Sequence, residues 1–170
     1  ILTFESPTGG YNWWGNDDPG NRILTAIALW QFADLQGIIE TDPAVAERHR
    51  TWLVSQQATD GSWPAGDALH AGNESLGEDV LRSTAYIATG LHRDGQAEGA
   101  VNQALRYLRR HIGDTDDLYA VALAANLFAE AAPEDVEAAE EEAGCHCSGG
   151  GEDSHDEEAG DENDHAHGEE

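Results

Sequence analysis

The two cysteines of this 170-residue chain and several of its histidines gather near the C-terminal end, where they could bind a metal ion. They are Cys145, His146, Cys147, His155, His165 and His167. Thiolates and imidazoles bind soft or borderline metals. Structural zinc sites usually have two to four residues between their cysteines, whereas a single residue separates Cys145 from Cys147. We therefore predict no metal site and no other cofactor site, and expect only adventitious nickel or zinc binding.

A second candidate is the aromatic and acidic stretch "YNWWGNDDPGN" at residues 11–21. It contains Tyr11, Trp13, Trp14, Asp17 and Asp18. Aromatic rings beside carboxylates could form a sugar subsite, but glycosidases need two carboxyls on opposite sides of the bond, and adjacent aspartates point in different directions. Loop packing, with a type I turn at Asp18–Pro19 and a helix cap at Asn21, is the favoured interpretation.

The elements that would position these residues are helical. Residues 1–20 are rich in Gly, Pro, Asn and Asp, which predicts a loop or extended segment. Six helical segments follow, at 22–35, 43–57, 81–91, 97–111, 117–129 and 133–142. Asp42 and Pro43 form an N-cap and first-turn proline for the second segment. The first, third and fifth segments are apolar almost all round, the second and fourth are amphipathic, and the sixth is charged.

This alternation predicts an all-α architecture of helical hairpins. A helix that is apolar all round needs neighbours on every side, whereas an amphipathic helix needs only one. An α/α toroid, with an inner ring of buried helices and an outer ring that covers them, meets both demands. The similar openings "TAIAL", "TAYIA" and "YAVAL" of the buried helices support internal repetition. We expect residues 21–142 to form a partial toroid of three hairpins, which would be marginally stable or aggregation-prone by itself.

Charge is distributed unevenly along the chain. Of 34 acidic residues, 16 fall in residues 133–170, which contain no basic residue. Residues 143–170 have almost no apolar side chains, so we predict a disordered acidic tail. The eight basic residues are all arginine. A lysine-free acidic surface suits a high-salt host, although a GC-rich genome would also favour arginine.

Composition also limits the partners. The net charge of −26 would repel a nucleic-acid backbone, and no basic stripe exists to receive one. No apolar run approaches the ~20 residues needed to cross a bilayer. The chain begins at Ile1 and not at methionine, so we interpret it as a fragment or processed piece whose targeting signals would lie elsewhere.

The helix at 43–57 and the turn after it resemble the repeat of triterpene cyclases. The matching residues are Trp52-Leu53, Gln57 and Gly61-Ser62-Trp63. Arg48 fits the basic start of that repeat, while His49 departs from its usual Gly or Ala. In α/α toroids this repeat ties a helix end to the next turn, so the resemblance implies that Trp63 and Gln57 are structural.

Longer segments are similar to the thioester domain of the alpha-2-macroglobulin and complement family, particularly its bacterial and archaeal members. They are "GGYNWWGNDDPGNRILTAIALWQFADL", "WLVSQQATDGSWPAGDALHAGNESLGEDVLRSTAYIATGL" and "DLYAVALAANLF". Together they span roughly residues 8–132 in the order and spacing of that domain. The resemblance implies an α/α toroid within a large protease-trapping or surface-defence protein, and hence an extracellular or cell-surface location.

The reactive element of that family is a Cys-Gly-Glu-Gln thioester, which this chain lacks. The thioester would therefore lie upstream of Ile1 or be missing from the parent protein. His70 follows the Asp-Gly-x-aromatic turn at about the place where the central complement component carries the histidine that attacks the thioester. A neutral imidazole is a suitable nucleophile for acyl transfer. A loop-packing role for His70 is the alternative.

One motif resembles a catalytic element of another class. Asp114-Thr115-Asp116-Asp117 matches the Asp-x-Asp-Asp acid of class II terpene cyclases, which needs a dry aromatic cavity to keep its middle aspartate protonated. The run stands just before a helix, where carboxylates cap amide groups and interact favourably with the helix dipole. Capping is the favoured interpretation.

Two hypotheses about function follow. The first is a non-catalytic structural and interaction module of an alpha-2-macroglobulin-like endopeptidase inhibitor, whose partners are the other domains of the parent chain and target proteases or surface nucleophiles. The alternative is an α/α-toroid enzyme, either a terpene cyclase-like or a glycosidase-like fragment.

Overall fold

The computed structural model describes residues 2–15, 19–38, 40, 42–66 and 76–133. In the compact unit Ile1–Val136, the described residues form five α-helices, α1 (Arg22–Asp34), α2 (Pro43–Ser55), α3 (Val80–Asp94), α4 (Glu98–His111) and α5 (Leu118–Ala131). Two 3-10 turns, Leu2–Phe4 and Ile112–Asp114, complete its regular structure among the described residues. The second unit, Glu137–Glu170, lies outside them, as does nearly all of the helix expected at 133–142.

Local sequence explains where the helices begin. The side chain of Asn21 accepts a hydrogen bond from the Leu24 amide at the start of α1. Asp42 caps α2 in the same way through the Ala44 amide, with Pro43 at the first helical position. Since side-chain oxygens satisfy amides that have no partner within the helix, these caps fix the first turns. Both predicted caps are therefore confirmed.

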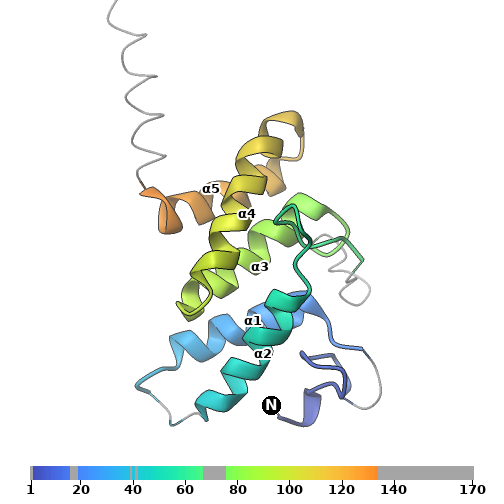
Figure 1. Ribbon diagram of the computed structural model, residues 1–170, viewed down its shortest axis with the longest axis vertical. Coiled ribbons are helices and arrows are strands. Elements are labelled where there is room, and N and C mark those ends of the chain that lie inside the picture. The colour runs from blue at the N-terminus through green and yellow to red at the C-terminus, as the bar shows by residue number, and fades with distance from the viewer. Residues whose placement is uncertain (1, 16–18, 39, 41, 67–75, 134–170) are drawn as a thin grey trace, which may run out of the picture. The chain divides into compact units, whose positions relative to one another are not determined.

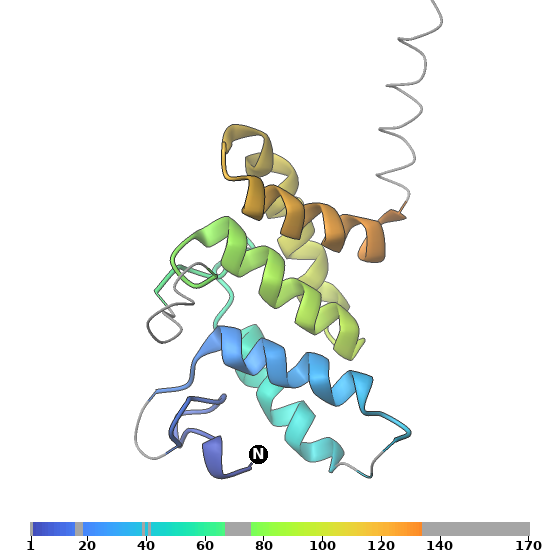
Figure 2. The same ribbon diagram turned by 180° about the vertical axis from the view of Figure 1, so that it is seen from behind.

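The helices form two layers. Helices α1, α3 and α5 lie side by side in one layer, because α3 packs against both α1 and α5 (Figure 2). Helix α2 packs on α1 and α4 packs on α3, which makes the second layer (Figure 1). The all-α prediction is confirmed, and the predicted alternation between two layers of helices matches these contacts.

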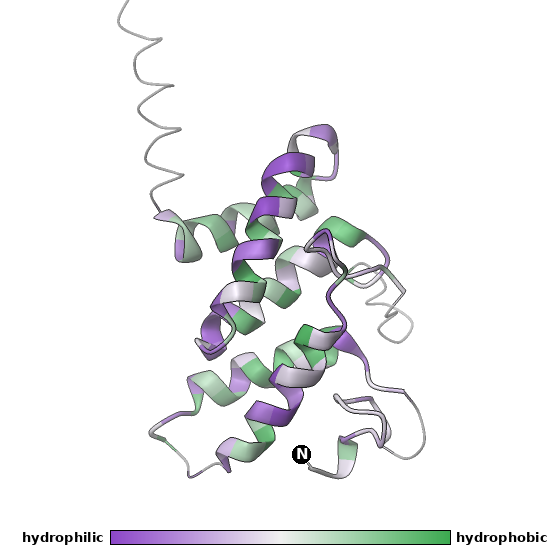
Figure 3. Ribbon diagram, viewed as in Figure 1, coloured by the Kyte–Doolittle hydropathy of each residue, from purple (hydrophilic) through white to green (hydrophobic). Residues whose placement is uncertain are grey.

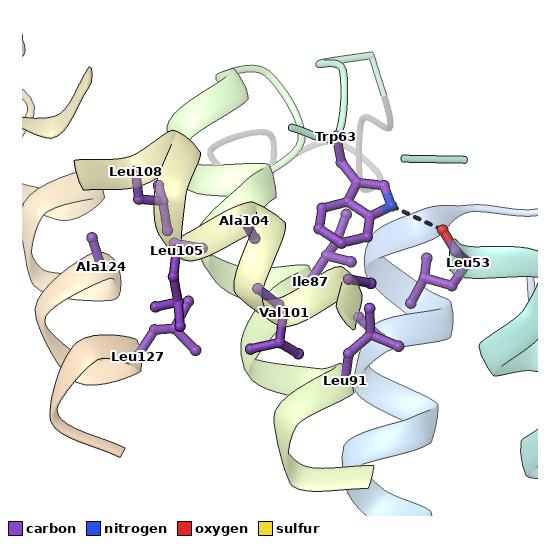
Figure 4. Packing of buried hydrophobic residues seen from close by; sticks show 14 of the residues in the cluster. Leu53, Trp63, Ile87, Leu91, Val101, Ala104, Leu105, Leu108, Ala124 and Leu127 are labelled. Atoms are coloured by element: carbon purple, nitrogen blue, oxygen red, sulfur yellow. Dashed lines mark hydrogen bonds between the residues drawn. The ribbon is translucent and has the colours of Figure 1, made fainter. Parts of the chain in front are cut away.

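The core follows the predicted amphipathic pattern in α4. Its buried residues are Ala100, Val101, Ala104, Leu105 and Leu108. Figure 3 shows the polar side of α4 facing away from this stripe. In Figure 4 the stripe meets Ile87 and Leu91 of α3 on one side and Leu127 of α5 on the other. These side chains join the two layers into one core.

The apolar helices differ in how much of their surface is buried. Helix α3 is buried along most of its length, as predicted. Helix α5 buries only Ala120, Ala124 and Leu127. Leu118 at its start is 83% exposed. This exposure agrees with the expectation that a partial toroid leaves inner helices uncovered, because α5 has α3 as its main helical neighbour among the described residues.

Arginines of α3 connect the helices of the first layer. The guanidinium of Arg93 lies 5.0 Å from the ring of Trp30 in α1, and its Nε donates to Glu130 of α5 at 2.8 Å. Arg82 lies over the ring of Tyr119 at 5.6 Å and also pairs with Asp117. Each arginine thus combines a cation–π contact with an ion pair across helices.

Helices α1 and α3 approach each other closely. A Cβ atom at Gly90 would lie 2.7 Å from the carbonyl oxygen of Ala26. No real Cβ tolerates that distance from a backbone atom, so one helix would have to shift. Gly90 therefore sets the spacing of the pair.

We predict opposite effects for two glycine-to-alanine substitutions within helices. Gly90→Ala should lower the free energy of unfolding by about 1–3 kcal/mol, because the added methyl overpacks the α1–α3 contact. Gly99→Ala in α4 should raise it by up to about 1 kcal/mol, since an added Cβ there meets no atom within 4 Å. Urea unfolding followed by circular dichroism measures both. Equal effects of the two variants would contradict the close approach.

Candidate functional site

The turn after α2 is fixed by side-chain hydrogen bonds. Gln57 donates through Nε2 to the carbonyl oxygens of Gly61 at 2.9 Å and of Ala100 at 3.0 Å. The Asp60 carboxylate accepts from the amide and hydroxyl of Ser62, and these bonds lower the pKa of Asp60. Gly61 has φ +96°, and a Cβ there would lie 2.4 Å from the Gln103 carbonyl oxygen. Only glycine fits this position.

Trp63 closes the turn, as the sequence predicts. Its side chain is fully buried, and its Nε1 donates to the Leu53 carbonyl oxygen at the end of α2 at 2.9 Å (Figure 4). Its amide donates to the Thr84 hydroxyl of α3 at 3.0 Å. The indole therefore satisfies a helix-end carbonyl and connects α2 to α3.

His70 lies outside the described residues, but both ends of the segment that contains it are described. The Gly66 amide donates to the Gly77 carbonyl oxygen at 2.7 Å. The Ser83 hydroxyl donates to the Leu76 carbonyl oxygen at 3.0 Å, which ties the second end to α3. The segment that bears His70 thus starts and ends at adjacent points beside the Trp63 turn.

The aspartate run before α5 has the structure of a helix cap. Asp117 accepts hydrogen bonds from the Tyr119 and Ala120 amides, and it pairs with Arg82. The Arg82 contact lowers the pKa of Asp117, which keeps this carboxylate ionised. Asp116, which would be the protonated acid of a cyclase, is exposed. The run therefore stabilises a helix, as the capping interpretation predicts.

The aromatic residues of the 11–21 stretch have different environments. Tyr11 is buried, and its ring stacks on that of His49 with 4.1 Å between centroids. Trp13 and Trp14 are 42% and 65% exposed. Asp17 and Asp18 lie outside the described residues. Tyr11 takes part in loop packing, and the arrangement of rings and carboxylates that a sugar subsite needs is not brought together by the described residues.

A polar cluster around His49 was not predicted from the sequence. Arg48 donates to both carboxylate oxygens of Glu5, with Nε–Oε1 and Nη2–Oε2 distances of 3.1 Å each. This pair lowers the pKa of Glu5. The His49 Nε2 atom lies 3.5 Å from Glu5 Oε1, and burial lowers the pKa of His49. Burial also raises the pKa of Tyr11 to about 12.

The only available signal for this cluster was the departure of His49 from the small residue usual in the cyclase-type repeat. His49 shares the apolar face of α2 with Val45 and Leu53, which indicated a core position. Nothing in the pattern indicated that Glu5, more than forty residues earlier, would reach it.

A surface depression of about 620 Å³ lies between α1, α2 and the end of α3. Its charged lining residues are Glu47, Arg50 and Asp94. Asp94 is buried and pairs with Arg50, which satisfies both charges. The depression therefore offers an ion pair that stabilises the fold and not an activated catalytic group.

Metal ligands do not cluster in the part of the chain that the structure describes, where no group of three or more His, Cys, Asp or Glu side chains could hold an ion. The cysteines and histidines of the C-terminal tail, from Cys145 to His167, lie outside that part. None of the described helices has the length and apolar character that a bilayer span requires.

Comparison with protein families shows which family the described fold resembles. The model of the A-macroglobulin TED domain, the thioester domain of complement-type proteins, matches residues 1–143. The match covers all five helices, the Trp63 turn and the segment that bears His70.

We predict that two neighbouring glutamines differ in their contribution to stability. Gln57→Ala should lower the free energy of unfolding by about 1–2 kcal/mol, because it removes one hydrogen bond within the turn and one that holds the turn to α4. Gln56→Ala should change it by less than about 0.5 kcal/mol, since the Gln56 side chain is exposed and its hydrogen bond is to the neighbouring Ser55 hydroxyl. Chemical denaturation compares the two. If Gln57→Ala lowers the free energy of unfolding no more than Gln56→Ala does, the stabilising role of the Gln57 hydrogen bonds is contradicted.

Proposed function

Because the chain belongs to the A-macroglobulin TED domain family, we propose that it is a non-catalytic structural and interaction module of an alpha-2-macroglobulin-like protein. The parent protein would trap proteases or act in surface defence, outside the cell or on its surface. The observation that carries this proposal is the family match over residues 1–143. In support, Asp117 of the cyclase-like run and Asp94 in the surface depression are both engaged in ion pairs.

The proposed arrangement of the module is an α/α toroid. Helices α1, α3 and α5 would belong to its inner ring, and α2 and α4 to its outer ring. The stepwise packing of α1 on α3 and of α3 on α5 supports this view. The next inner helix would then pack on the exposed edge of α5. That edge presents Leu118, Val121, Ala122, Ala125 and Ala129.

Small residues on the exposed edge of α5 favour packing of another inner helix there. Between α1 and α3, close contact depends on Ala26 and Gly90. The exposed alanines of α5 would permit a similar approach by another helix with small residues. A polar surface helix would instead present charged side chains at this edge.

His70 is the residue for which we propose a chemical role. In a protein with an intact thioester, the imidazole nitrogen would attack the glutamyl carbonyl carbon and break its bond to the cysteine sulfur. The resulting acyl-imidazole would pass the acyl group to an acceptor hydroxyl, whose proton would go to the thiolate. Placement of His70 in a segment with fixed ends, between Gly66 and Gly77, supports this role.

The full-length product of the gene tests this proposal. If a Cys-Gly-Glu-Gln element precedes these residues, methylamine should add covalently, and mass spectrometry should locate the adduct on the glutamine. His70→Ala should reduce transfer to the hydroxyl groups of glycerol by about a hundredfold, while the reaction with methylamine continues. His92→Ala, at the end of α3, is the matched control and should leave both reactions unchanged.

Two outcomes would count against the proposal. A complete cyclase or hydrolase site in the full-length product would rule out the non-catalytic module. Equal glycerol transfer by the wild type and His70→Ala would rule out the chemical role of His70 but not the non-catalytic module.

The edge of α5 gives a prediction for the isolated chain. Residues 1–170 should self-associate, and Leu118→Gln combined with Val121→Gln should reduce the associated fraction severalfold by removing exposed apolar surface. Ile38→Gln changes a side chain that is 73% exposed in the α1–α2 connection and should have little effect. Sedimentation velocity at low salt measures all three proteins. A wild-type chain that stays monomeric would contradict the prediction.

A further inference from the structure

The first described residues form a small hairpin that packs on α2. In this N-terminal hairpin, residues Phe4–Asn12, the Ser6 amide donates to Gly10 O and the Asn12 amide donates to Phe4 O. Glu5 and Tyr11 form an antiparallel bridge. The two side chains of that bridge both reach α2, where they meet Arg48 and His49. The hairpin is thus held by a compact polar contact.

Glycines bring the hairpin backbone directly onto Trp52 of α2. A Cβ at Gly9 would lie 2.2 Å from Trp52 Cδ1, and a Cβ at Gly10 would lie 2.5 Å from Trp52 Cζ3. Both glycines have positive φ angles, of 99° and 74°. The backbone therefore rests on the indole without intervening side chains. Tyr11 also joins the hairpin to the start of α1, because its amide donates to the Thr25 hydroxyl at 2.9 Å and its carbonyl oxygen accepts from the Asn21 amide at 2.7 Å.

His49 is at the centre of this contact. Its Nδ1 lies 2.7 Å from the Val45 carbonyl oxygen, which can only accept, so Nδ1 carries a proton. In the neutral ring, Nε2 then has a lone pair. That nitrogen and the Tyr11 hydroxyl are both buried without a hydrogen-bond partner among the described residues. A second proton on His49 would enter a site that is 1% exposed.

Burial disfavours this second proton, and the charged groups that face His49 act in opposite directions, since the Glu5 carboxylate favours the proton and Arg48 disfavours it. Glu5 lies nearest, but both of its carboxylate oxygens already accept from Arg48. Arg48 adds a positive charge beside the ring. Tyr11 covers the ring face and is neutral. An imidazolium would therefore share an acceptor with a guanidinium, in a place that water does not reach.

We propose that docking of the N-terminal hairpin on α2 is linked to proton release from His49, so that the hairpin is held at neutral pH and loosens in acid. This pH-dependent docking goes beyond the proposed function and does not depend on it. When the hairpin lifts, His49 gains access to water and can take a proton. Protonation therefore favours the open form.

The pH range follows from the lowered pKa of docked His49. Above the ordinary histidine pKa of 6.5, both forms are neutral and docking is at full strength. Below 6.5 the open form binds the proton first, so each unit of pH weakens docking by up to about tenfold. Docking weakens no further once the pH falls below the pKa of His49 in the docked form. Glu5, with its own lowered pKa, responds only in more acidic solution.

Hydrogen exchange on the full chain tests the proposal. Amides of residues 4–12, corrected for intrinsic rates, should lose at least several-fold protection between pH 7.5 and pH 5.5, while amides of α3 keep theirs. His49→Phe preserves a ring against Tyr11 and cannot titrate, so its hairpin should keep the same protection at both values. His111→Phe, at the exposed end of α4, is the matched control and should behave like the wild type.

A titration of the unmodified chain covers the case in which His49→Phe fails to fold. The imidazole signal of His49 in NMR spectra should give a pKa below 6.5. A value above 6.5 would mean that the proton tightens the hairpin, and it would overturn the proposal. Hairpin protection that does not change with pH in the wild type, or acid loosening that persists in His49→Phe, would overturn it as well.

Discussion

Burial of the Trp63 indole is the constraint on which the rest of the structure depends. The ring fills the space between α2 and α3, and its single donor gives the Leu53 carbonyl a second partner beside the Gln56 amide. The amide of the same residue is bound by Thr84. One side chain thereby fixes the end of α2, the start of the next segment and the position of α3. Since α3 contacts α1, α4 and α5, displacement of Trp63 would disturb both layers.

Features that depend on nearby residues could be predicted from the sequence. Asn21 and Asp42 act on amides two or three positions away, so their roles follow from local order. The apolar stripe of α4 has a helical period, and the Trp63 turn repeats a known local pattern. The contact of Glu5 with His49 could not be predicted, because it joins distant residues without a shared period. The apolar sequence of α5 indicated that it needs neighbours, but a sequence pattern cannot supply the neighbours themselves. The surroundings of His70 stay a prediction.

Polar groups in the described core serve two different purposes. Asp94 with Arg50 and Asp117 with Arg82 are complete pairs, so neither carboxylate is left without an opposite charge. The Glu5 cluster differs, because it leaves the Tyr11 hydroxyl and one His49 nitrogen unpaired. Burying such atoms costs about 1–3 kcal/mol each. Stability in the hairpin region is therefore lower than packing alone would allow, while the contact between α1 and α3 depends on shape and carries no such penalty.

The arginines of α3 have a consequence for behaviour in concentrated salt. Ion pairs at the protein surface weaken when dissolved ions screen their charges. A guanidinium stacked on an aromatic ring also gains dispersion and excludes water from the ring face, and neither contribution is screened in the same way. Arg93 on Trp30 and Arg82 on Tyr119 would therefore keep the three helices joined at ionic strengths where a lysine–carboxylate pair would contribute little. In this lysine-free chain, salt that screens the many carboxylates would therefore not weaken the contacts between these helices to the same degree.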